Sequence, residues 1–168
     1  MKFKIIYLFL LLSLSVSAID YIEIRNLFAA SPHNESKAKL LMDKTSGATT
    51  SNAVLLGYRG GVHMAMANHC YLPTSKLSYF NTGKALLEQA IAALPGSVEL
   101  RFIRFSIQCN VPGFLGYSSN LSADKNILIT WVKSEGASKD SDLKTRIKSF
   151  LLISKQCTEA EKTSIKNV

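Results

Sequence analysis

The chain has 168 residues, and its 20 lysines and arginines against 12 aspartates and glutamates give a formal net charge of +8. A chain of this length is expected to form one domain. The basic residues are scattered, without the runs interleaved with aromatic residues that nucleic-acid-binding proteins show, so we expect no nucleic-acid partner. The positive charge predicts a weak attraction to acidic surfaces.

Residues 1–18 have the pattern of a secretory signal peptide. Lys2 and Lys4 precede an apolar segment without charges, and the small residues at 15–18 form a cleavage site. The apolar segment is short for a membrane span, which needs ~20 residues, and an uncleaved anchor is the alternative. Cleavage would leave one helical domain, residues 19–168, in which 18 basic residues face 12 acidic ones, a net charge of +6. We expect a periplasmic or secreted protein without a later membrane span.

The spacing of apolar residues predicts an all-α fold of about seven helices. Asn34 and Ser97 are expected to cap the second and fifth helices, and a break is expected at 111–117, which contains Pro112 and two glycines. Thr158 begins a capping-box pattern for a last turn, with a frayed tail as the alternative. The seven helices are expected at residues 20–30, 35–45, 51–70, 75–94, 98–110, 120–134 and 139–155.

The helix predicted over 98–110 is apolar on two opposed faces. At 100° per residue, the two faces comprise Leu100, Ile103 and Ile107 on one side and Val98, Phe102, Phe105 and Cys109 on the other. Such a helix is not a surface helix. We therefore expect it to lie between two layers of helices.

Small residues recur every four positions in the third predicted helix, at Ala53, Gly57, Gly61 and Ala65. A glycine inside a helix costs ~1 kcal/mol relative to alanine. We expect this stripe to let a neighbouring helix approach closely, which compensates for the cost. A kink near Gly60 is the alternative.

Part of the fourth predicted helix resembles a tetratricopeptide repeat. Gly83, Leu87, Ala90 and Pro95 have the spacing of that family's second helix, and Leu56-Gly57 matches its Leu-Gly pair. The likeness covers residues 52–111, and the inserted linker at 71–74 makes the repeat longer than the family's. The resemblance implies stacked antiparallel helical hairpins, a TPR-like α-α superhelix whose concave surface binds an extended partner.

Two segments, residues 73–83 and 99–117, resemble a set of small secreted proteins of unknown function from Gram-negative bacteria. The shared phrases are residues 76–80 (KLSYF), 101–105 (RFIRF) and 114–117 (FLGY). The resemblance implies export and brings no activity with it.

A polar edge of the helix predicted over 98–110 is the candidate ligand-binding site. Arg101 and Arg104, one turn apart, can hold a carboxylate or phosphate, with Gln108 beyond them. Tyr79 and Tyr117 are expected to supply aromatic walls. The alternative is that the arginines form internal ion pairs with Glu99, Asp124 or a helix C-terminus.

The remaining reactive residues predict no metal, cofactor or catalytic group. His63 and His69 lie six residues apart, whereas a helical metal pair needs a spacing of four. The acidic residues are scattered, and no nucleophile motif is present. Cys70, Cys109 and Cys157 lack CxxC spacing and allow one bridge, Cys70–Cys109 or Cys109–Cys157, or none.

These observations favour an exported, non-catalytic helical-repeat module that binds a peptide or protein partner in the cell envelope. One alternative is a small enzyme or carrier for an anionic ligand clamped by Arg101 and Arg104. Another is a purely structural subunit. The oligomeric state stays open.

Overall fold

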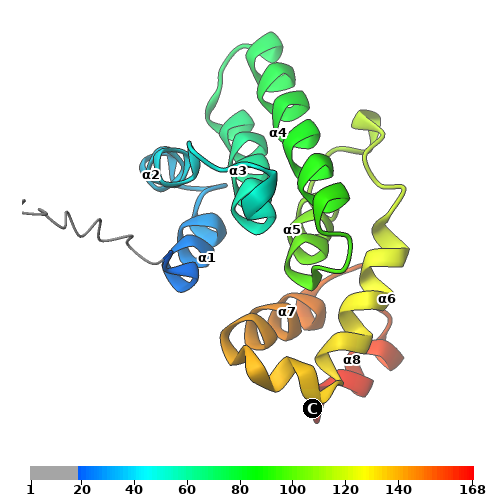
Figure 1. Ribbon diagram of the computed structural model, residues 1–168. Coiled ribbons are helices and arrows are strands. Elements are labelled where there is room, and N and C mark those ends of the chain that lie inside the picture. Colours follow the sequence, from blue (N-terminus) through cyan, green and yellow to red (C-terminus); the bar gives the residue numbers. More distant parts are fainter. Residues whose placement is uncertain (1–18) are drawn as a thin grey trace, which may run out of the picture.

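The computed structural model describes residues 19–168, and within that range it contains eight α-helices and no β-strand (Figure 1). The predicted all-α fold is therefore confirmed, while the predicted signal peptide lies outside the described residues. The α-helices are α1 (Tyr21–Ala30), α2 (Glu35–Thr45), α3 (Ala53–Met66), α4 (Pro73–Ala93), α5 (Val98–Gln108), α6 (Leu121–Val132), α7 (Ser141–Ile153) and α8 (Glu159–Lys166). Short 3₁₀ helices occupy Thr50–Asn52, Ala67–His69, Gly113–Leu115 and Glu135–Lys139.

The helix starts follow from local capping. The side chain of Asn34 accepts a hydrogen bond from the amide of Lys37, and that of Ser97 accepts one from the amide of Leu100. Thr158 and Glu161 form the predicted capping box, so the last segment is a helix and not a frayed tail. Both predicted caps and the capping box are confirmed.

Several helix boundaries differ from the predictions by one to four residues, and those around residues 66–73 are the most informative. Helix α3 ends at Met66 and continues only as a 3₁₀ turn, four residues earlier than expected. Helix α4 begins at Pro73, two residues earlier than expected, because proline at the first helical position has a preset φ and needs no hydrogen-bond partner for its nitrogen.

Helix α5 lies between two hydrophobic cores. Its residues Leu100 and Ile103 are fully buried in the first core, which it shares with α1–α4, and Phe105 is fully buried in the second core, which it shares with α6–α8. The other members of its two apolar faces pack the same way: Ile107 against the first core, and Val98, Phe102 and Cys109 against the second. The predicted position of this helix between two layers is confirmed.

Helices α3 and α4 lie side by side (Figure 1), and glycines set their separation. An added Cβ at Gly60 would lie 2.6 Å from the backbone nitrogen of Leu87 and 2.7 Å from the carbonyl oxygen of Gly83. The glycines of the predicted stripe accommodate side chains and not the backbone of a neighbouring helix. Gly57 gives space to the side chain of Leu100, and Gly61 gives space to an aromatic ring of α1. Helix α3 runs through Gly60 without a break.

A buried arginine of α1 ties the two cores together. Arg25 donates hydrogen bonds from Nε and Nη2 to the Glu99 carboxylate of α5, at 2.8 and 2.9 Å. It also pairs with Asp140, which caps α7, at 2.7 Å and with Asp142 at 2.9 Å. Tyr58 of α3 donates its hydroxyl to the same Glu99 carboxylate at 2.6 Å. The network fixes α1, α3, α5 and α7 relative to one another.

Candidate functional site

Arg104 of α5 is buried in an ion-pair cluster. Its Nε and Nη2 donate to the two carboxylate oxygens of Asp124 at 2.6 and 2.9 Å, and its Nη1 donates to Glu88 of α4 at 2.8 Å. Burial lowers the pKa of Arg104, but the hydrogen bonds and charges of these two carboxylates outweigh burial and raise the pKa above its ordinary value. All three guanidinium nitrogens therefore have internal acceptors.

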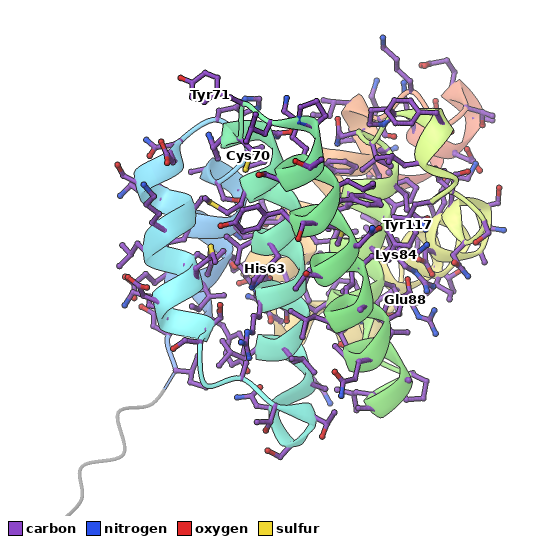
Figure 2. All side chains as sticks on the ribbon, turned by 90° about the horizontal axis from the view of Figure 1, so that it is seen from above. His63, Cys70, Tyr71, Lys84, Glu88 and Tyr117 are labelled. Carbon is purple, nitrogen blue, oxygen red and sulfur yellow. The ribbon has the colours of Figure 1, made fainter. Side chains whose placement is uncertain are left out.

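Tyr117 joins the same cluster from the segment between α5 and α6. Its hydroxyl donates to Glu88 at 2.6 Å, and the ammonium of Lys84 lies 5.1 Å from the centre of its ring (Figure 2). Burial and the neighbouring Glu88 carboxylate raise the pKa of Tyr117. The tyrosine thus holds Glu88 toward Arg104 and presents no open aromatic wall.

Two of the five predicted site residues form no hydrogen bond with the arginines among the described residues. Tyr79 packs against the first core beside His63, with the two ring centres 5.9 Å apart. Gln108 is buried, and neither polar atom of its side chain has a hydrogen-bond partner among the described residues. The structure therefore brings Arg101, Arg104 and Tyr117 together around Asp124 and Glu88.

Arg101 is the more accessible of the two arginines. Its side chain is 20% exposed, and its Nη1 lies 3.4 Å from Asp124. Its Nη2 donates to the carbonyl oxygen of Pro95 at 3.0 Å. The alternative interpretation of both arginines is internal ion pairing, with Asp124 among the partners. Arg104 is fully paired in this way, whereas Arg101 forms only a longer contact with Asp124.

A shallow surface pocket of about 460 Å³ lies between the start of α5 and the outer side of α6. Its wall is mainly apolar and includes Ile127, which is 41% exposed, and Trp131, the only tryptophan of the chain. We call it the α5–α6 pocket; it is lined by Val98, Asn126, Ile127, Thr130, Trp131 and Ser134.

The Arg101–Asp124 pair is near this pocket along both helices, although neither residue lines it. Arg101 follows Val98 by one turn of α5, and the fully buried Asp124 precedes Ile127 by one turn of α6. The sequence does not predict this pocket, because its wall is formed by residues of two helices whose relative position depends on tertiary packing. The signal in the sequence is the exposed Ile127 four residues before Trp131, a tryptophan that is partly buried against the second core.

The two histidines of the third predicted helix have different surroundings. The Nδ1 atom of His63 is buried without a hydrogen-bond partner among the described residues, and His69 Nε2 contacts the carbonyl oxygen of Ser31 at 2.7 Å. Within residues 19–168, no group of three or more histidine, cysteine, aspartate or glutamate side chains is placed to hold a metal ion.

The buried position of His63 predicts a pH dependence of stability. Burial, with a smaller contribution from Arg59, lowers the pKa of His63 below its ordinary value of 6.5. Because the unfolded chain then binds the proton more readily, we expect stability to be complete above pH 6.5 and to fall as the pH drops through the lowered pKa. Urea unfolding between pH 7.5 and pH 5.5, roughly one unit on either side, measures this.

The matched variant for the pH experiment is His63→Met, which fills the site without titrating. It is expected to flatten the decline in unfolding free energy over this pH range. An equally steep decline in the variant would show that another group is responsible.

The three cysteines are free thiols in the structure. Cys109 lies with its Sγ 3.8 Å from the hydroxyl of Ser154, and Cys157 is buried in the same second core. Cys70 follows the 3₁₀ turn after α3 and donates its thiol hydrogen to the carbonyl oxygen of Met66 at 3.4 Å. The sequence allows one disulfide bond or none, and the structure contains none among these three cysteines.

Among the helices of residues 19–168, none combines the length and apolarity that crossing a bilayer requires. The chain matches no protein-family model, and searches among curated proteins and among solved structures find no match either.

Proposed function

We propose that this protein is an exported, non-catalytic helical module that binds a peptide or protein partner in the cell envelope through the α5–α6 pocket. The observation that carries the proposal is the half-exposed Ile127 beside the chain's only tryptophan in an apolar surface pocket. Tryptophan is enriched among the residues that dominate binding energy at protein interfaces.

The chemistry of the pocket suggests the kind of partner. Its apolar wall suits one aliphatic or aromatic side chain of an extended segment. The side chain of Arg101, one turn after Val98, is 20% exposed, and its pairing with Asp124 is long, at 3.4 Å, so a carboxylate of the partner can compete for it. The preferred partner is therefore a segment with an apolar anchor next to aspartate or glutamate.

The alternative of an anionic ligand clamped by two arginines has less support. Arg104 is buried, and its three nitrogens already donate to Asp124 and Glu88. An anion would have to displace two carboxylates to reach it. Of the two arginines only Arg101 is partly exposed, so a bound anion would meet one guanidinium and not two.

The single tryptophan makes the proposal testable by fluorescence. Residues 19–168 are used to select peptides from a displayed random library, and the enriched peptides are titrated against the protein. We expect an apolar residue beside an acidic one in the selected sequences, and a shift of Trp131 emission on binding. Ile127→Asp is expected to weaken binding at least about ten-fold, the effect of losing an interface anchor.

Ile153→Asp is the matched control, because this isoleucine is also exposed but lies on α7, outside the pocket. It is expected to bind the peptides like the unchanged protein. Selected peptides that leave Trp131 emission unchanged, or that bind Ile127→Asp normally, would contradict the proposal.

A further inference from the structure

The outward side of α7 is a second surface, distinct from the α5–α6 pocket. The inner side of this helix is buried in the second core through Leu143, Ile147 and Leu151. The outer side bounds a depression of about 470 Å³ lined by Lys144, Thr145, Lys148, Ser149, Leu152 and Val168.

The acidic side chains near this surface are already paired with arginines. Asp140 pairs with Arg25, and Asp142 pairs with Arg25 and Arg146. Among the described side chains, no carboxylate pairs with Lys144 or Lys148. Lys148 donates to the carbonyl oxygen of Lys166 at 2.9 Å and to an oxygen of Val168, the last residue of the sequence, at 2.6 Å, so Lys144 is the lysine of this surface without an anionic partner among the described residues.

The C-terminal end of the same surface is apolar. Leu152 lines the depression, and the next residue, Ile153, is 79% exposed. At 100° per residue, Lys144 and Lys148 lie along one edge of the outer face and Ile153 along the other, with Thr145 and Ser149 between them. The face therefore combines ammonium groups, hydroxyl groups and an exposed aliphatic side chain.

We infer that the outer face of α7 docks on an anionic lipid bilayer. Ammonium and hydroxyl groups suit the phosphates of lipid headgroups, while Leu152 and Ile153 suit the boundary between headgroups and acyl chains. The charge complementarity extends beyond one helix, since residues 19–168 carry 18 basic and 12 acidic residues. The inference does not depend on the function proposed for the α5–α6 pocket.

The test is sedimentation of the protein with vesicles of mixed phosphatidylglycerol and phosphatidylcholine, and with vesicles of phosphatidylcholine alone. We expect binding to the anionic vesicles only, and weaker binding at high salt. Lys144→Gln with Lys148→Gln is expected to reduce partitioning at least about five-fold, the effect of one unpaired charge near the surface. The single substitution Ile153→Ser is also expected to reduce the fraction of protein bound to the anionic vesicles.

The matched control is Lys37→Gln with Lys76→Gln, which removes the same charge from exposed lysines of α2 and α4. It is expected to bind nearly as well as the unchanged protein. Absence of binding to anionic vesicles overturns the inference, and so does an equal loss in both double variants. Binding that ignores Ile153→Ser and is fully displaced by soluble poly-aspartate also overturns it, in favour of an acidic protein partner. Thermal melting of each variant confirms that it is folded.

Discussion

Replacing Arg25 by methionine is expected to lower the free energy of unfolding by about 3–5 kcal/mol. The methionine fills most of the volume but leaves the Glu99 carboxylate, whose side chain is only 11% exposed, without its positive partner. Tyr58 would remain as its one hydrogen-bond donor from another helix. Asp140 and Asp142 are more accessible and can be hydrated, so the loss arises mainly at Glu99. Urea unfolding followed by circular dichroism measures the change.

Two variants separate a buried charge from a lost contact. In Arg25→Met combined with Glu99→Gln, the uncompensated charge is gone and Tyr58 keeps an acceptor, so we expect most of the stability to return. Arg146→Met removes an arginine paired with Asp142 within one helix at the surface, and it should cost no more than about 1 kcal/mol. A double variant as unstable as Arg25→Met would show that packing, and not charge, dominates.

The parts of the fold that the sequence predicts well are those with a repeating signal. Helix α5 is the clearest case, because the separation of Leu100 and Ile103 from Phe105 by helical geometry was sufficient to place it between two cores. The caps Asn34 and Ser97 were predictable because capping depends on residues only a few positions apart.

The ion pairs were much less predictable, because their partners are distant in sequence and have no period. Arg25 meets Glu99 across 74 positions and Asp140 across 115. Glu99 had been considered as a partner of the α5 arginines, and it faces Arg25 instead. Asp124 was correctly named as a partner of these arginines, whereas Glu88 was missed, since nothing along α4 distinguishes it from a solvent-exposed glutamate.

The candidate site shows the same limit. Arg101 and Arg104 were identified as one edge of a helix, but helical geometry does not tell how much of each side chain a neighbouring helix covers. Burial differs sharply between them because Arg104 lies one turn deeper, between α4 and α6. The α5–α6 pocket depends on which side of α6 faces α5, and only tertiary packing determines that.

Gly60→Ala is the second substitution with a large expected effect. In an isolated helix it would stabilise by ~1 kcal/mol, since alanine is the better helix former. Here the new Cβ would meet backbone atoms of α4, at 2.6 Å from the nitrogen of Leu87 and 2.7 Å from the oxygen of Gly83. Backbone atoms cannot rotate away, so the two helices must separate. Such overpacking costs typically about 1–3 kcal/mol or more, and we expect it to exceed the helix gain by about 2 kcal/mol.

Gly96→Ala is the control for Gly60→Ala, because an added Cβ there has no atom within 4 Å and the residue has no positive φ. It is expected to be neutral or to stabilise by up to about 1 kcal/mol through the unfolded chain. Thermal and urea unfolding of both variants would therefore move in opposite directions. If Gly60→Ala is as stable as the unchanged protein, then α3 and α4 do not approach as closely as described. The distance between the axes of α3 and α4 would then be larger than in the structure. The surfaces that these two helices bury against α5 would also lie farther apart.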